Sequence, residues 1–508
     1  MRLRAYLRER YRALFAYAGE ILTIIGILYL IPPLLLLFYP HELSQLGGFL
    51  LAGLPLIVAG LAFWKLFIPK EAPSLTVQES YVVVVLVWGI AILTGTIPFL
   101  INSGLDFSQA LFESTSGWTG TGLTVVDVAN ASHLMLFYRS FMQLAGGTGF
   151  AIIAVSAIAG MPGAGLSAAE GRTDQLAPHV RQSASIVMRI YAGYIVFGIL
   201  ALWAAGMDLF DAVNHAFTAL STAGFSTRVE SIGYWDNPVI EGIIVVLMLL
   251  GATNFLIAYT VLRRKLRAAA RSGEIRMMFL VLPVSIVLVL AVATSSLYPT
   301  LEKGLRVAVF EVTSAATTTG FSTVNTAGLP PFVWMVLLVL MLMGGGTGST
   351  AGGIKQFRIY IVYKSVIWEI KKAFMPAHMV NEPAIWQGEK RQLLNDRQVR
   401  LMAAFIGMYI GVFLTGSLVM VAFGYDIDES LFEFASTLGG VGMSVGVTAP
   451  DMPRVVMWMQ SIGMLLGRLE FFPVILGVLK ISFDAKTLLS LPRDRDEATY
   501  ERQRERSH

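Results

Sequence analysis

Long apolar stretches with few charged residues recur along this chain of 508 residues. One stretch runs from Ile21 to Tyr39, a second begins at Phe49 and continues through the 60s, and others follow at intervals. A membrane-spanning helix needs about 20 largely uncharged residues. The composition agrees, since 55% of the residues are apolar and 14% are charged, whereas soluble domains average about a quarter charged. The pattern predicts an all-α polytopic membrane protein.

Clusters of basic residues separate the apolar stretches, and such clusters mark the cytoplasmic side of a membrane. They lie at Arg2 to Arg12, Arg263 to Arg276, Lys355 to Lys372, Lys390 to Arg400 and Arg493 to Arg506. With ten spans, all of these clusters would fall on one side, which predicts that both termini are cytoplasmic. We expect no nucleic-acid binding despite the net charge of +4. The chain has no cysteine, and its six histidines show no metal-ligand spacing.

Four segments of the chain align without gaps, and each ends on a glycine: Glu113 to Gly122, His215 to Gly224, Glu311 to Gly320, and Glu433 to Gly442. An ionisable side chain stands nine residues before each glycine, at Glu113, His215, Glu311 and Glu433. A hydroxyl stands six residues before it, at Ser116, Thr218, Ser314 and Ser436. Another hydroxyl stands two residues after it, at Thr124, Ser226, Ser322 and Ser444. The shared register indicates a repeated structural unit.

The spacing of the four glycines predicts the form of that unit. Successive copies are 102, 96 and 122 residues apart (224−122, 320−224 and 442−320), which leaves room for two spans and a loop. The segment before each glycine holds about 11 residues and reaches only about half the hydrocarbon thickness. Irregular backbone at that depth is tolerated only where protein or a water-filled cavity surrounds it. Each unit is therefore predicted to be a helix, a re-entrant pore loop and a helix, and the four units are predicted to lie in a pseudo-fourfold arrangement around a central pore.

Glycine- and hydroxyl-rich pore loops suit a dehydrated cation. Backbone carbonyls replace the hydration shell of the ion without burying several full negative charges, and glycine permits the backbone conformation that aims them at one axis. The C-terminal ends of four half-helices would add partial negative charge. The alternative is that these residues only allow close helix packing. Glu113, Glu311 and Glu433 could bond the loops from behind or simply lie near the start of each half-helix.

These segments resemble the Trk/Ktr/HKT superfamily of potassium transporters, in particular its TrkH-type members with two extra N-terminal helices. The resemblance is carried by Phe112-Glu-Ser-Thr-Ser-Gly-Trp-Thr-Gly-Thr-Gly122, by Gly224-Phe-Ser-Thr and by Thr318-Thr-Gly-Phe-Ser-Thr323. It implies a potassium-binding filter lined by Gly120, Thr121, Gly122, Thr222, Ala223, Gly224, Thr318, Thr319, Gly320, Gly440, Val441 and Gly442. In plant relatives, glycine in all four copies goes with potassium preference. The fourth copy departs most, because Gly440 and Val441 carry no hydroxyl.

A glycine-rich run interrupts the second span of the third copy. It comprises Gly344, Gly345, Gly346, Thr347, Gly348, Ser349, Thr350, Ala351, Gly352 and Gly353. Such a run breaks a helix, because each glycine costs about 1 kcal/mol relative to alanine. A nucleotide-binding P-loop does not fit, since Ile354 separates the glycines from Lys355 and no strand precedes them. The resemblance implies an intramembrane gating loop below the filter; a flexible kink is the alternative.

Arg468 lies near the middle of the apolar stretch from Val455 to Ile481. An arginine at such depth is costly and usually faces a cavity or a partner. The resemblance implies that it lies in the pore below the filter as an electrostatic barrier to cations. The alternative is a salt bridge to Glu470 or to a neighbouring span.

The resemblance also implies how the chain is divided and what it does. We expect an N-terminal two-helix region at 1–78, pore repeats at 79–182, 183–276 and 277–389, and a fourth repeat with a cytoplasmic tail at 390–508. The expected function is potassium uptake across the inner membrane by a homodimer embedded in lipid and regulated by a cytosolic TrkA-type nucleotide-binding ring. We expect potassium to be the transported ion and nucleotide to act only through that ring, because no G-x-G-x-x-G fingerprint follows a strand here.

Two other functions fit parts of the sequence. A secondary symporter would couple potassium to sodium or protons around a midplane site, although four parallel copies favour a pore. The segment from Gly442 to Gly446 matches the G-x-S-x-G elbow of hydrolases, but it lacks the expected strand, turn and helix. We therefore expect a protein that is not an enzyme.

Overall fold

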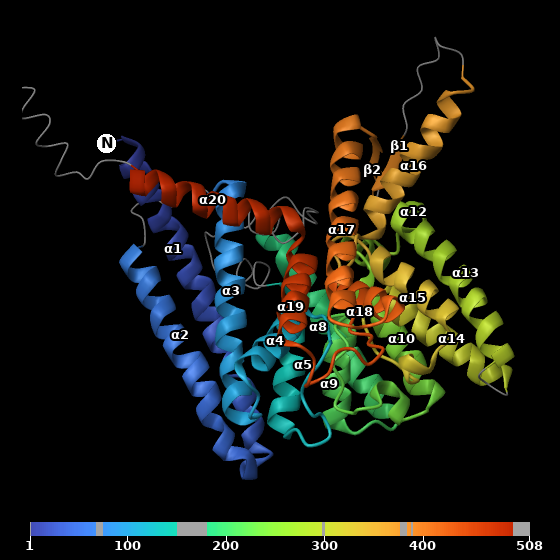
Figure 1. The fold of residues 1–508 in the computed structure, drawn as a ribbon, viewed down its shortest axis with the longest axis horizontal. Helices are drawn as coiled ribbons and strands as arrows, with labels where there is room; N and C mark the ends of the chain where they lie inside the picture. Colours follow the sequence, from blue (N-terminus) through green and yellow to red (C-terminus); the bar gives the residue numbers. More distant parts are fainter. Residues whose placement is uncertain are drawn as a thin grey trace, which may run out of the picture.

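The computed structural model describes residues 2–67, 75–149, 180–296, 300–375, 384–387 and 390–490. Most of this part is helical, and the longer helices stand side by side (Figure 1). The predicted all-α membrane architecture is confirmed. A small antiparallel hairpin was not predicted: β1 (Ala384–Gln387) pairs with β2 (Lys390–Leu393) beside the upper end of α17 in Figure 1.

The first two helices form an antiparallel pair at one edge of the molecule (Figure 1). Helix α1 (Arg2–Tyr29) is joined to α2 (Leu46–Phe67) by two short 3₁₀ helices, η1 (Pro32–Leu37) and η2 (Pro40–Gln45). Glycines let the two backbones approach closely, because a Cβ at Gly19 would lie within 3.0 Å of the Gly60 carbonyl oxygen. Small residues serve this purpose between helices in membranes.

Four units follow, and each has a first helix, a short pore helix and a second helix. The units are α3 (Val77–Asn102), α4 (Phe107–Thr119) and α5 (His133–Thr148); α8 (Val180–Ala204), α9 (Leu209–Leu220) and α10 (Pro238–Ala252); α13 (Gly273–Ser296), α14 (Leu301–Ala316) and α15 (Pro331–Met343); α17 (Asp396–Ala422), α18 (Ile427–Gly439) and α19 (Arg454–Leu469). The pore helices hold 12 to 16 residues, about 18–24 Å, so none crosses a bilayer core of about 30 Å.

The four units are packed in a ring. Each pore helix packs between the first and second helices of its own unit. The second helix of each unit also packs against the pore helix of the next: α5 on α9, α10 on α14, α15 on α18, and α19 on α4. Because the last contact returns to the first unit, the four units close on themselves.

The second helices of the units end early, which corrects part of the sequence prediction. The prediction placed a break only in the third copy. In the structure, α10 is followed by α11 (Phe255–Leu262) after a bend of 110°, and α19 by α20 (Phe471–Ser490) after a bend of 103°. The remaining elements are α12 (Leu266–Arg271), α16 (Gln356–Lys372), η3 (Ser231–Tyr234) and η4 (Thr326–Gly328). Polar residues stand at both breaks inside apolar sequence: Thr253 follows α10, Asn254 caps the start of α11, and Glu470 follows α19.

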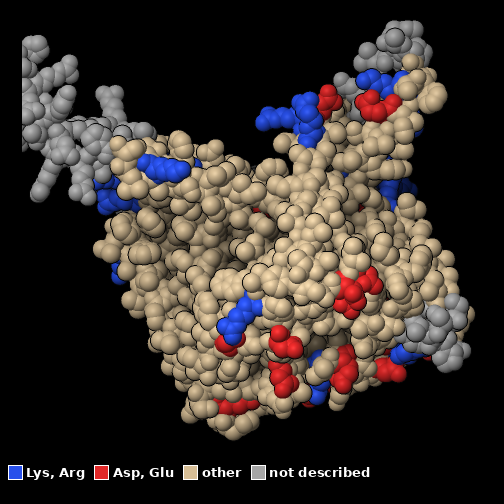
Figure 2. Space-filling view, in the orientation of Figure 1, with Lys and Arg blue, Asp and Glu red and all other residues tan. Residues whose placement is uncertain are grey.

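Among the described residues, six helices are long and apolar enough to cross a membrane, or up to eight if each bent pair is one span. The expected count of ten therefore depends on α5 and α15, which have 16 and 13 residues and are too short to cross alone. Figure 2 shows a broad band almost free of charge, with Asp and Glu gathered toward the lower rim.

Three of the four expected divisions of the chain lie at the start of the first helix of a unit. Those after residues 78, 182 and 276 fall within the first four residues of α3, α8 and α13, and the one after residue 389 falls between β1 and β2.

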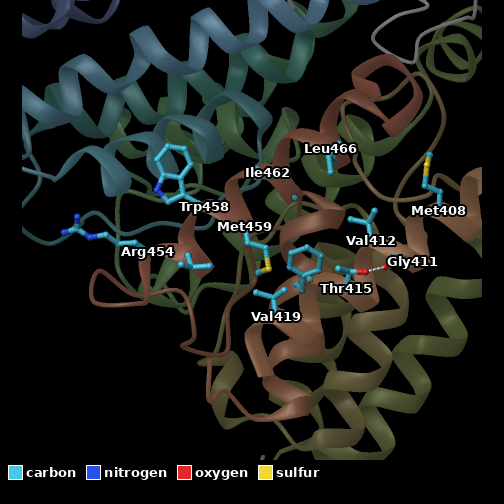
Figure 3. A pocket seen from close by; sticks show the side chains of 14 residues that line it. Met408, Gly411, Val412, Thr415, Val419, Arg454, Trp458, Met459, Ile462 and Leu466 are labelled. Carbon is cyan, nitrogen blue, oxygen red and sulfur yellow. Dashed lines mark hydrogen bonds between the residues drawn. The ribbon is translucent and has the colours of Figure 1, made fainter. Parts of the chain in front are cut away.

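An apolar cavity of about 750 Å³ lies between α17 and α19 (Figure 3). Met408 and Val412 of α17 line it together with Trp458, Met459 and Ile462 of α19. Gly411 of α17 leaves room for it, since nothing lies within 4 Å of a Cβ added there. A surface of this kind suits hydrocarbon rather than water.

Candidate functional site

The backbone takes the same unusual course at the end of every pore helix. The four aligned glycines have positive φ angles: +92° at Gly122, +73° at Gly224, +86° at Gly320 and +98° at Gly442. The residue two positions earlier is also left-handed in each copy: +71° at Gly120, +50° at Thr222, +54° at Thr318 and +64° at Gly440. Threonine is uncommon in this region, and strained residues of this kind concentrate at functional sites.

One hydrogen bond repeats where the chain leaves each pore helix. The N–H directly before each aligned glycine donates to the carbonyl five residues earlier: Thr121 to Ser116 at 3.0 Å, and Ala223 to Thr218, Thr319 to Ser314 and Val441 to Ser436, each at 2.9 Å. The four turns therefore share one geometry despite their different side chains.

The hydroxyls six residues before the glycines have different roles. Ser116 and Ser436 accept from the N–H of Gly122 and Gly442 at 3.1 and 3.0 Å. Ser314 instead donates to the carbonyl of Phe321 at 2.6 Å. Thr218 donates within its own helix, to Asn214.

Each of the four glycines lies against the loop of the next copy, and the last lies against the first, so the contacts form a closed ring. A Cβ added at each would lie well inside 3.0 Å of the carbonyl oxygen of the middle residue in the next loop: Gly122 against Ala223, Gly224 against Thr319, Gly320 against Val441, and Gly442 against Thr121. No side chain fits at these positions without moving a neighbouring carbonyl. The structure therefore brings together all four predicted loops around a ring of four carbonyl oxygens.

The ionisable residue of each copy bonds the hydroxyl that stands eleven residues later. The partners are Glu113 and Thr124 at 2.9 Å, His215 and Ser226 at 2.9 Å, Glu311 and Ser322 at 3.1 Å, and Glu433 and Ser444 at 2.8 Å. All four ionisable side chains are fully buried. These four side chains therefore hold the segment that follows each glycine. They bond the chain two residues beyond the three predicted filter positions of each copy.

Two residues that sequence reasoning missed connect the first unit to the second. Gln143 of α5 donates to the Ala223 carbonyl at 2.7 Å and accepts from the Phe225 N–H at 3.0 Å. Arg139 donates to Glu113 at 2.8 Å, and its guanidinium lies 3.9 Å above the Phe225 ring. Neither residue recurs in the register of the repeats. The only signal in the sequence was the charge of Arg139 inside the apolar stretch of α5, since such a charge usually faces a cavity or a partner.

The glycine-rich run of the third unit, which joins α15 to α16, contacts three loops. The Gly352 N–H donates to Thr318 Oγ1 at 2.8 Å, and Thr222 Oγ1 donates to Thr350 Oγ1 at 3.1 Å. A Cβ at Gly352 would meet the carbonyl oxygen of Gly439 at the end of α18. Gly344, Gly348 and Gly353 take positive φ angles, of +67°, +70° and +76°. The run is thus seated against the second, third and fourth copies.

The other members of the run lie beside the break after α10. The Gly346 N–H donates to the Ala252 carbonyl at 2.9 Å, and the Thr347 N–H to Glu274 at 2.8 Å. Gly345 packs on Ala351, and Ser349 donates to the Gly346 carbonyl at 2.6 Å.

Arg468, near the end of α19, ties this run to the first unit. Its guanidinium donates to the carbonyls of Thr350 at 3.0 Å, Gly146 at 2.5 Å and Gly147 at 3.0 Å. Glu470, the alternative partner considered for Arg468, forms an ion pair with Arg358. A positive charge therefore lies where the run meets the C-terminal end of α5.

The ring offers groups that suit a dehydrated cation. It offers backbone oxygens, and the C-terminal ends of four half-helices direct partial negative charge toward it. The hydrolase elbow is not formed at Ser444, because that serine donates to Glu433 and follows a helix rather than a strand.

Comparisons with known proteins agree with this arrangement. The family model TrkH, described as cation transport protein, matches residues 56–486. The Trk system potassium uptake protein TrkH of Escherichia coli strain K12 is 34% identical over 421 residues, covering 80% of this chain and 86% of its own length. An uncharacterized cation transporter of Methanocaldococcus jannaschii is 30% identical and covers 93% of this chain and 96% of its own length. The crystal structure of the potassium transporter TrkH from Vibrio parahaemolyticus superposes with a TM-score of 0.78 at 27% identity, covering 92% of this chain and 98% of the other.

Proposed function

Because this chain belongs to the TrkH family of cation transport proteins, we propose that it carries potassium into the cell along the axis of the four-glycine ring. The observation that carries the proposal is the closure of that ring, in which each glycine abuts a carbonyl of the next copy. The relative from Escherichia coli is named as a potassium uptake protein, and the solved relative as a potassium transporter.

In this proposal the ion is held by the backbone of the twelve filter positions, which are residues 120–122, 222–224, 318–320 and 440–442. Two features support the assignment: the repeated left-handed backbone and the shared hydrogen bond at the end of each pore helix. Backbone oxygens serve in all four copies, so the missing hydroxyls of the fourth copy do not remove a ligand.

We further propose that residues 344–353 form the gate and that Arg468 holds it shut. The run is bonded to Thr318 and to Thr222, and Arg468 bonds Thr350 from another unit. The positive charge of the guanidinium adds an electrostatic barrier to cations at the same place. To open the pore, the run would have to break these hydrogen bonds. A cytosolic regulatory ring of nucleotide-binding proteins would act by moving the run.

We also propose the oligomeric state, the membrane and the orientation in which the protein works. The protein acts as a homodimer in the cytoplasmic membrane with both termini cytoplasmic, and lipid chains occupy apolar surfaces such as the cavity between α17 and α19. The acidic lower rim in Figure 2 and the basic loops near α12 and α16 support that orientation, because basic loops prefer the cytoplasmic side. The unit divisions at 78, 182, 276 and 389 belong to the same proposal.

The test is potassium uptake by cells that lack their own uptake systems and express wild type, Gly122→Ser or Gly424→Ser. Gly424 is the matched control, since its φ is +98° but nothing lies within 4 Å of an added Cβ. A serine at 122 pushes against the Ala223 carbonyl. We expect the preference for potassium over sodium to fall about tenfold or more, equivalent to about 1.4 kcal/mol, in Gly122→Ser alone. Equal selectivity in both variants would contradict the filter assignment.

A further inference from the structure

Two histidines and a carboxylate meet at the lower end of the molecule, away from the ring of glycines. His41 and Glu42 belong to η2, the connector between the first two helices, and His133 is the first residue of α5. One ligand atom from each of the three lies within 4.8 Å of the others. No spacing along the sequence indicates this cluster, because the two histidines are 92 residues apart (133−41) and only the fold brings them together.

The separations of the three groups suit a small, tightly bound ion. His133 Nδ1 lies 3.2 Å from Glu42 Oε1, and His41 Nε2 lies 3.7 Å from the same oxygen. Zinc binds imidazole nitrogen and carboxylate oxygen at about 2.0–2.2 Å in tetrahedral geometry, which places neighbouring ligand atoms about 3.4 Å apart. We propose that His41, Glu42 and His133 bind a divalent transition-metal ion of the zinc class.

The carboxylate of this site is already fixed in place. Glu42 is only 6% exposed. It accepts from the N–H groups of His133 at 2.9 Å and Leu134 at 2.8 Å, at the start of α5. A carboxylate has about four lone-pair sites, so these two bonds leave capacity for a metal ion. They also orient Oε1 toward both imidazoles.

The His133 ring is held by aromatic neighbours from two other parts of the chain. Tyr39 stacks on it, with ring centroids 4.2 Å apart and planes 14° from parallel. Phe210 of α9 approaches it edge-on, with centroids 5.0 Å apart. The ring is thus oriented before any ion arrives, which reduces the entropy lost on binding.

The site is open to solvent on the side of the histidines. The side chains of His41 and His133 are 70% and 45% exposed. An ion can enter directly, and water can complete a fourth position, as in zinc sites with three protein ligands.

Two imidazoles with one carboxylate select zinc, copper or nickel over magnesium and calcium, which prefer all-oxygen sites. The site is therefore chemically distinct from the carbonyl ring proposed for potassium. An ion bound there would clamp the connector of the first two helices onto α5.

The experiment measures zinc binding to untagged, detergent-solubilised protein by equilibrium dialysis. We expect one zinc ion per chain in wild type. Removing a residue that only hydrogen-bonds a metal ligand lowers metal affinity about 10–100-fold. His41→Ala and His133→Ala each remove a ligand itself and should therefore weaken zinc binding by at least that factor. His41→Cys restores a zinc ligand and should bind, and His378→Ala, which removes a different histidine of the chain, should bind as wild type.

Thermal unfolding of each variant in the presence of EDTA checks that the fold is kept, and the exposed position of His41 makes its replacement benign. Zinc should raise the melting temperature of wild type and of His41→Cys but not of His41→Ala. Wild-type affinity in His41→Ala and His133→Ala, or no zinc bound to the wild-type chain, would overturn the proposal.

Discussion

At position 433 a buried carboxylate accepts several hydrogen bonds from the segment that follows the fourth glycine. Glu433 accepts from Ser444 Oγ at 2.8 Å, from the N–H groups of Val445 and Thr448 at 3.1 Å each, and from Thr448 Oγ1. The corresponding residue of each other copy makes the same bond to the hydroxyl eleven residues later. Each aligned glycine is thereby held between a pore helix before it and an anchored segment after it.

Replacing this carboxylate should destabilise the protein. Glu433→Ala leaves several buried donors without an acceptor, and each such group costs about 1–3 kcal/mol. We expect the free energy of unfolding to fall by about 3 kcal/mol or more, measured as a lower melting temperature in detergent micelles. Asp428→Ala, at an exposed position of the same helix, is the control and should change little. Equal losses in the two variants would refute the anchoring role.

The residues that recur in register could be found from the sequence, and those that connect different copies could not. The positions nine before and two after each glycine stand out because they repeat four times, and the structure makes them hydrogen-bond partners. Gln143 occurs once and bonds Ala223, which is 80 residues away. Its role depends on how α5 packs against α9, and no periodicity within α5 reports that packing.

At the scale of elements, the second helix of each unit stops short. Helices α5, α10, α15 and α19 have 13 to 16 residues, and the glycine-rich run occupies the space near their ends. Only the third break was visible in the sequence, because it contains a cluster of glycines. The bends after α10 and α19 occur at Thr253 and Glu470 within apolar stretches, where hydropathy predicts a continuous span.

Release of the glycine-rich run should follow from removing Arg468. Hydrogen bonds from a charged group contribute about 1.5–3 kcal/mol each. Arg468→Ala loses the bonds of the guanidinium, which should shift the equilibrium toward the open state by about tenfold or more. We expect higher potassium uptake in cells without a regulatory ring. Arg454→Ala, at the exposed start of the same helix, should behave as wild type. Unchanged uptake in Arg468→Ala would rule out its proposed role in closure.

At the scale of the whole molecule, the contacts of helices and the contacts of loops follow the same circular order. Helix α19 of the last unit packs on α4 of the first, and Gly442 of the last loop abuts Thr121 of the first. The four-copy architecture could be predicted because the chain repeats itself. Its pseudo-fourfold arrangement around a central pore was part of the same prediction. The individual contacts that close the ring could not be predicted, since they join residues more than 300 positions apart (442−121).

The most direct test of this account is to locate a potassium substitute by anomalous X-ray diffraction from crystals grown with thallous ion. The account predicts a peak on the axis of the ring, surrounded by the carbonyl oxygens of Thr121, Ala223, Thr319 and Val441, and displaced when potassium is added in excess. Thallous ions bound only elsewhere, with none inside the ring of carbonyls, would contradict it.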